Sequence, residues 1–140
     1  MNPLTKNISL KSLKVIILER IFQQNNLKIY SKGSKVGRND LLVRLNDAGA
    51  SCDIRGLYFT EGDEHIDNHI NVDHAAPNTY SNQYFKGILA DASRAVFSGR
   101  TLIRKIAQKS EALEGDKNLI LSEGARVNTK PSLEIYADDI

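Results

Sequence analysis

Short segments in which apolar and polar residues alternate recur along this chain of 140 residues, and glycines lie between or within them. Between positions 41 and 45, Leu41, Val43 and Leu45 alternate with Leu42 and Arg44. A period of two is typical of a strand with one buried face, whereas a helix repeats its apolar residues three and four positions apart. The pattern predicts an all-β domain with no convincing helix between its strands.

The same reasoning predicts strands along most of the remaining chain. They are Cys52–Phe59, Ile66–Val72, Tyr80–Leu89, Arg94–Arg104, Lys117–Leu121 and a proline-initiated strand within Arg126–Ala137. Their centres recur at roughly the 8 to 12 residue spacing of all-β domains, which leaves a sandwich, a barrel and a β-helix open. The stretch 9–24 also fits a helical period, but its β-branched residues favour a strand.

Composition and charge exclude several classes of partner. The 19 Lys and Arg against 17 Asp and Glu give a net charge of +2 that is spread along the chain, so we expect no nucleic acid partner. The longest aliphatic run, Val15–Leu18, is far shorter than the roughly 20 apolar residues of a membrane helix, and no signal peptide is visible. We expect a single-domain cytoplasmic protein without a membrane partner.

Cys52 is the single cysteine, so the chain forms no internal disulfide and no multi-cysteine metal site. It shares its parity with Ile54, which predicts that its side chain lies in the core. A buried thiol has a raised pKa and little reactivity.

All three histidines lie between positions 64 and 74. A strand here would place Ile66, Ile70 and Val72 on one face. It would place His65, Asp67 and His69 on the other face, with about 7 Å between each residue and the next. This arrangement raises the hypothesis of a metal-binding module. Side chains on one face of a straight strand do not converge, so a solvated polar face is the favoured interpretation.

One enzymatic interpretation has weaker support, and several others are excluded. A small β-helical carbohydrate-active enzyme would need paired carboxylates, for which Asp67 and Asp73 are the candidates. The chain carries no nucleotide-binding, serine hydrolase or kinase motif, so any ATP-driven step belongs to a partner.

The segments Val127–Pro131 and Leu133–Asp139 closely resemble a signature of the SufB/SufD family of iron-sulfur cluster assembly scaffold proteins. Further stretches that resemble family landmarks, in family order, are His74–Thr79, Ser81–Gln83, Lys86–Gly87, Ser93–Gly99 and Asn118–Leu121. The resemblance covers residues 27–140 and weakens in residues 1–26.

This resemblance implies a right-handed parallel β-helix, a solenoid of short strands that is truncated at its C-terminal end. It also implies a non-catalytic scaffold subunit that works with a SufB-like scaffold and a SufC-like ABC ATPase. In the family, the chain continues beyond the Tyr-Ala-Asp-Asp landmark into a Cys-Ser-His-Gly-type segment and a helical domain that docks the ATPase. Neither has a counterpart here, so we carry over no catalytic residue and no metal or cluster ligand. We expect a nascent cluster only in the full complex, and none on this chain alone.

A solenoid that ends at a strand exposes unpaired backbone groups, and these recruit another edge. The strand around Leu133–Asp138 lies, in the family, near the partner scaffold. The resemblance therefore indicates a partner interface at Lys130, Glu134, Tyr136 and Asp138, through which a homodimer is also expected.

Overall fold

The structure is a computed structural model that describes residues 4–8, 13–18, 25–32 and 37–139, with the backbone alone described for 4–8, 13–18, 25 and 32. The described part of the chain contains no helix, and therefore none that could cross a bilayer. It forms ten strands: β1 Leu4–Ile8, β2 Leu13–Leu18, β3 Asn25–Lys32, β4 Gly37–Leu45, β5 Ser51–Thr60, β6 His65–His74, β7 Tyr80–Leu89, β8 Arg94–Ile103, β9 Glu111–Ile120 and β10 Arg126–Ile135.

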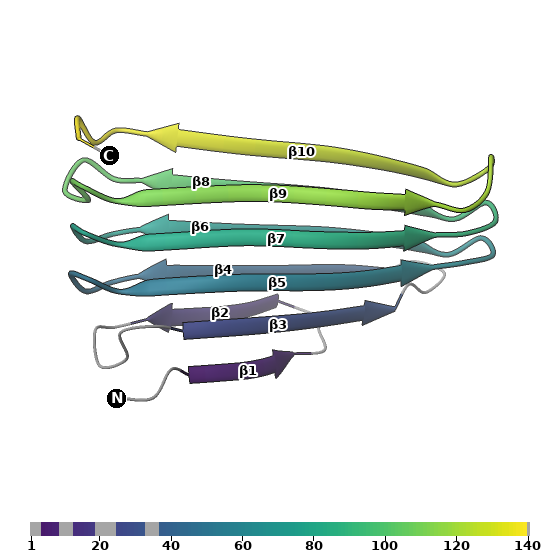
Figure 1. The fold of residues 1–140 in the computed structure, drawn as a ribbon, viewed down its shortest axis with the longest axis horizontal. Coiled ribbons are helices and arrows are strands. Elements are labelled where there is room, and N and C mark those ends of the chain that lie inside the picture. Colours follow the sequence, from purple (N-terminus) through teal and green to yellow (C-terminus); the bar gives the residue numbers. More distant parts are fainter. Residues whose placement is uncertain (1–3, 9–12, 19–24, 33–36, 140) are drawn as a thin grey trace.

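The strands make two parallel sheets that face each other. One sheet has the order β1-β3-β5-β7-β9 and the other has the order β10-β8-β6-β4-β2, so each strand pairs with the strand two places further along the chain. In Figure 1 the odd-numbered strands run to the right in front, and the chain returns to the left behind them, one level higher. This path is a right-handed coil, the hand that parallel crossover connections almost always take.

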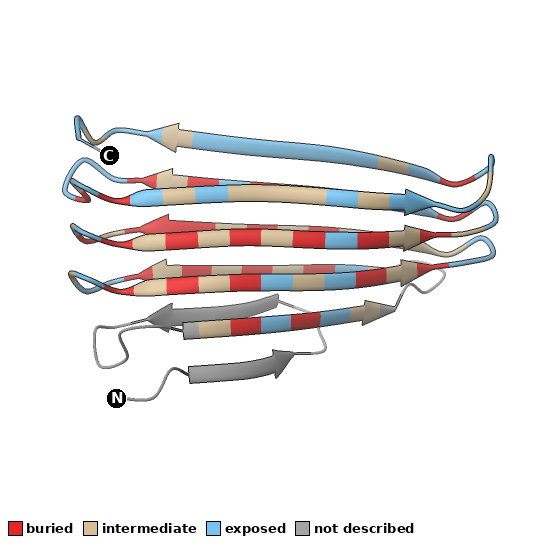
Figure 2. Cartoon of the chain, viewed as in Figure 1, coloured by how far each residue is buried: buried red, intermediate tan, exposed pale blue. Residues whose placement is uncertain are grey.

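The register aligns equivalent positions of successive coils into columns. Ser51 on β5 pairs with Tyr80 on β7, and Tyr80 pairs with Glu111 on β9. Because side chains alternate across a strand, each column points wholly inward or wholly outward. The buried and half-buried positions of β5 and β7 alternate accordingly in Figure 2, and the inward columns form one core between the sheets.

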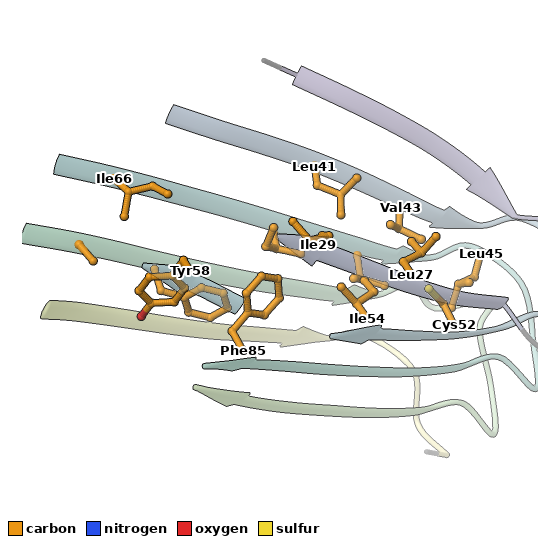
Figure 3. Packing of buried hydrophobic residues seen from close by; sticks show 14 of the residues in the cluster. Leu27, Ile29, Leu41, Val43, Leu45, Cys52, Ile54, Tyr58, Ile66 and Phe85 are labelled. Atoms are coloured by element: carbon orange, nitrogen blue, oxygen red, sulfur yellow. The ribbon is translucent and has the colours of Figure 1, made fainter. Parts of the chain in front are cut away.

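Two glycines make room for aromatic rings in this core. Gly56 is the register partner of Phe85, and a Cβ atom on Gly56 would collide with the Phe85 ring. Gly87 is the partner of Tyr58 and leaves space for the Tyr58 ring in the same way. Phe85 in turn packs on Phe97 of the opposite sheet, with ring centroids 4.8 Å apart. Figure 3 shows Tyr58 and Phe85 among the aliphatic residues of the core.

A recurring corner turn connects the sheets at one end of the coils. Gly49, Asn78 and Lys109 occupy equivalent positions of successive turns, and all three have a positive φ, between 56° and 82°. The turns stack through backbone hydrogen bonds, because the Gly49 N–H donates to the Pro77 carbonyl and the Asn78 N–H donates to the Gln108 carbonyl. The corner therefore repeats with the coil although its sequence does not.

Beside this corner lies a buried polar network centred on His74. Its Nδ1 atom is 2.7 Å from Thr79 Oγ1, and its Nε2 atom is 2.8 Å from Ser81 Oγ. Thr79 Oγ1 continues the network to Ser110 Oγ on the next coil, at 2.8 Å. Burial lowers the pKa of His74 to about 4, although the negative charge of Asp73 acts to raise it. The imidazole is therefore neutral at neutral pH.

The fold confirms the predicted all-β class and the right-handed parallel β-helix implied by the family resemblance. The predicted strand Tyr80–Leu89 coincides with β7. Within the stretch 9–24, β2 confirms a strand at Leu13–Leu18, and the remainder lies outside the described residues.

Most predicted strands differ from the observed ones in their bounds, by one or two residues at β5, β6 and β8 and by four at the start of β4. The two strands of the last coil show why. β9 begins at Glu111 rather than at Lys117, because its inward positions Glu114 and Asp116 are polar and hide the alternation. β10 ends at Ile135 rather than at Ala137, and Pro131 lies in its interior rather than at its start. A mid-strand proline is tolerated there because β10 is the outermost strand of its sheet.

The fit between glycines and rings gives a first prediction. Gly56→Ala and Gly87→Ala should each lower the free energy of unfolding by about 1–3 kcal/mol, because the added methyl group forces a core ring out of place. Gly115→Ala is the matched control: it lies on the outer face, where its Cβ would meet only the half-exposed Tyr84 ring, at 3.2 Å. We expect a change within about 0.5 kcal/mol for the control. Equal losses in chemical denaturation of all three variants would contradict the packing argument.

The neutral His74 gives a second prediction. An unfolded histidine has a pKa of about 6.5 and binds a proton more readily than folded His74 does. The stabilisation is therefore complete above about pH 6.5 and is lost as the pH falls toward about 4, by up to about 3 kcal/mol. Urea unfolding of the native chain and of His74→Gln across this range should show a steeper pH dependence for the native chain. Parallel pH profiles would contradict the prediction.

Candidate partner interface on the last coil

The last coil consists of β9 and β10, which are the outermost strands of the two sheets. Among the described residues β9 pairs with β7 alone and β10 pairs with β8 alone. Figure 2 shows β10 almost entirely exposed, whereas β6 and β8 beneath it carry alternating buried positions. Each of the two strands therefore presents one backbone edge to which another strand can be added.

Apolar residues in the inward columns are exposed on this coil. Leu133 continues the column of Thr101, and Ile135 continues the column of Ile103, both of which are buried. Leu133 is nevertheless 51% exposed and Ile135 is 39% exposed. On β9, Ile120 follows buried Leu89 and is exposed as well. Leu133 and Ile135 form an apolar surface, which we call the coil end, beside the edge of β10. Ile120 lies at the opposite end of the coil, because β9 and β10 run in opposite directions.

The interior of the last coil carries two acids, Glu114 next to Gln83 of the coil below and Asp116 next to Phe85. Glu114 Oε1 accepts a hydrogen bond from the Thr101 hydroxyl at 2.5 Å. Asp116 Oδ2 accepts from the Thr129 hydroxyl at 2.8 Å and from the Asn118 amide at 2.9 Å. Burial raises the pKa of Glu114, and the hydrogen bond from Thr101 opposes that rise. The last coil therefore combines acidic inward positions on β9 with the exposed apolar residues of the coil end.

The four residues predicted as a partner interface all lie on or just after β10. Lys130 and Glu134 are on its outer face, and Glu134 Oε2 accepts a hydrogen bond from Arg100 Nη2 at 3.0 Å. Tyr136 has a side chain that is 60% exposed, and its backbone N–H donates to the Ile103 carbonyl. Asp138 is exposed. The four residues share one parity of the chain, and each is exposed or half-exposed.

Sequence reasoning missed Leu133, Ile135 and Ile120 as surface residues. Their alternation is that of an ordinary buried face, so a single strand read alone predicts burial for them. The signal that finds them is the register of the whole stack, in which their columns have no further member among the described residues.

The structure does not bring the histidine segment together as a metal site. His65, Asp67 and His69 lie on the half-buried outer face of β6. His69 Nε2 is 2.7 Å from Asp67 Oδ1, which makes a local pair rather than a cage. Within the described ranges, no three His, Cys, Asp or Glu side chains are placed to hold a metal ion.

Asp67 and Asp73 do not form a pair of catalytic carboxylates. They lie six residues apart on one strand, or about 20 Å, whereas glycosidase carboxylates are about 5 to 10 Å apart. Asp73 is also only 6% exposed, although its parity on β6 is that of the outer face. Burial alone would raise its pKa, but ion pairs with Arg104, at 2.8 Å, and with Arg44, at 3.3 Å, outweigh that and lower it.

Cys52 lies in the core, as its parity predicts. Its side chain is fully buried, and burial, assisted by the charge of Asp53, raises the pKa of the thiol to about 12. Thiolate is the form that ligates metals and reacts as a nucleophile, so this cysteine is inert at neutral pH.

Comparison with known proteins relates the chain to one family. Residues 23–140 match the family model described as SUF system FeS cluster assembly, SufBD core domain. A SufBD family protein of Mycobacterium tuberculosis is 35% identical over 115 residues, which cover 77% of this chain and 29% of that protein. The iron-sulfur cluster assembly protein SufD of Escherichia coli is 33% identical over 108 residues, or 77% of this chain and 26% of that protein.

A plant relative gives the same result. Protein ABCI7, chloroplastic, of Arabidopsis thaliana is 31% identical over 111 residues, which cover 79% of this chain and 23% of that protein. The chain thus spans less than a third of the length of these relatives. The family match nevertheless covers every coil whose side chains are described. This chain belongs to the SufBD family, whose core domain serves the SUF system of iron-sulfur cluster assembly.

Proposed function

We propose that this chain is a SufD-like scaffold, without turnover of its own, in the assembly of iron-sulfur clusters. The observation that carries the proposal is the match of residues 23–140 to the SufBD core domain. Supporting it, the candidate metal and carboxylate groups of β6 do not converge, and Cys52 is buried. What the described surface offers is strand edges and apolar area, which suit protein binding.

The proposed partner is a SufB-like scaffold, and the proposed contact is the edge of β10 with the coil end. Added strands gain affinity from backbone hydrogen bonds and specificity from side chains beside the edge. Tyr136 and Leu133 would supply the buried anchors, because large exposed apolar groups dominate such interfaces. Lys130, Glu134 and Asp138 would form the charged rim. A SufC-like ATPase would take part through the complex rather than by contact with these coils.

Binding to the SufB-like protein of the same genome tests this proposal. Tyr136→Ala and Leu133→Asp should each raise the dissociation constant by about tenfold or more, because each removes an apolar anchor from the contact. Tyr30→Asp is the matched control, since Tyr30 is exposed to a similar degree and lies on β3, away from the last coil. Retained binding by both variants, or an equal loss in Tyr30→Asp, would contradict the assignment of the interface.

Self-association through the same edge is expected in the absence of a partner. Light scattering at rising concentration should show a dimer of the chain that Leu133→Asp weakens, because the variant places a charge on an otherwise apolar surface. The SufB-like protein should displace the second copy. A strictly monomeric chain at high concentration would exclude the homodimer.

We also expect that the chain alone holds no stoichiometric cluster after anaerobic reconstitution with iron and sulfide. The physical reason is that its single thiol is buried and protonated. Visible absorption and iron analysis measure the outcome, and Cys52→Ser should behave as the native chain does. A stoichiometric cluster that Cys52→Ser loses would contradict this part of the proposal.

A further inference from the structure

The outer face of the odd-numbered sheet carries a groove that the proposed function does not use. It is an open hollow of about 300 Å³ over β5, β7 and β9. Its apolar lining includes Leu57, Ile88 and Leu119, and its charged lining is Lys86 and Lys117. We call these five residues the lysine groove.

The register explains how residues from three coils meet there. Leu57 pairs with Lys86, and Lys86 pairs with Lys117, so the three form one outward column. Ile88 pairs with Leu119 in the next outward column, two positions further along the strands. Cations and apolar side chains are thus placed side by side, about 7 Å apart along the sheet.

The two lysines have no partner of opposite charge among the described residues. No ion pair or side-chain hydrogen bond joins either of them to a residue in the ranges that the structure describes. Asp53 lies on the same outer face, but nearer the start of β5, and it pairs with Arg55 at 3.5 Å. Like charges opposite each other on neighbouring strands are destabilising, so stability of the fold does not account for this pair.

The apolar half of the groove is also uncovered. Leu57 is 42% exposed and Leu119 is 57% exposed. Because neighbouring strands are about 4.8 Å apart, one carboxylate placed between Lys86 and Lys117 can accept hydrogen bonds from both ammonium groups. An apolar group next to that carboxylate would cover the adjacent column.

We propose that the lysine groove binds a protein segment that presents a carboxylate beside an apolar side chain. The carboxylate of the segment would contact Lys86 and Lys117, whose charges complement it. The apolar side chain of the segment would cover Leu57, Ile88 and Leu119. The groove lies in the sheet opposite β10, so its occupant is separate from a partner on the β10 edge.

The lining favours protein over other anionic ligands. Single-stranded nucleic acid is held by aromatic platforms along a basic track, whereas the apolar lining here is aliphatic. Anionic membranes attract clusters of four to eight basic residues, and this groove has two.

A synthetic peptide in which Glu and Leu recur three and four positions apart is the probe, and its Gln-for-Glu twin is the charge control. Fluorescence anisotropy with the full chain should give saturable binding of the Glu peptide. Lys86→Glu with Lys117→Glu should weaken that binding by about tenfold or more. Lys86→Arg with Lys117→Arg should retain it, because the charges remain.

The matched control is Arg94→Glu with Lys105→Glu, which reverses two exposed charges away from the groove. It should change binding by about twofold or less, because distant surface charges are screened. Thermal unfolding verifies that each variant folds, and Lys117→Glu alone should be at least as stable as the native chain, because it removes the like-charge pair. If a double variant fails to fold, Lys117→Glu alone serves as the binding test.

Four outcomes would overturn the proposal. They are no saturable binding at about 1 mM peptide, equal binding of the Gln twin, equal binding by the groove variant, and tighter binding of single-stranded DNA or phosphatidylserine vesicles than of the peptide.

Discussion

The parallel backbone register between each strand and the strand two places further along is the constraint on which this structure depends. It aligns like positions into columns, and a column cannot change face from one coil to the next. Every inward residue therefore packs against the residue above and below it as well as against the opposite sheet. Gly56 beneath Phe85 and Gly87 beside Tyr58 show how closely neighbouring coils must match.

Much of this fold could be predicted from sequence because alternation survives wherever the inward positions are apolar. The strand around Leu41, Val43 and Leu45 and the strand Tyr80–Leu89 are examples. Prediction failed at the start of β9, where Glu114 and Asp116 point inward and are satisfied by Thr101 and Thr129. Those partners belong to other strands, so no local pattern contains them. Periodicity alone could not select the β-helix, because it does not specify which strands pair.

The surfaces were harder to predict than the fold. A net charge of +2 spread along the chain gave no indication of a basic patch, yet the register places Lys86 and Lys117 side by side from positions far apart in sequence. The exposure of Leu133 and Ile135 was hidden in the same way, since a buried and an exposed inward residue look identical in one strand. Asp73 shows the converse. It lies on the outer face of β6, yet Arg44 and Arg104 from neighbouring coils pair with it and its side chain is buried.

Pro131, in the interior of β10, has a consequence for how the chain meets other strands. A proline has no N–H, so the row of donors along β10 is interrupted at its middle. Indiscriminate stacking of strands, as in amyloid, needs an unbroken row and few charges, and here Lys130 also stands next to the gap. β10 is thus guarded against uncontrolled fibrillar growth, and it favours an incoming strand whose own shape allows for the missing bond.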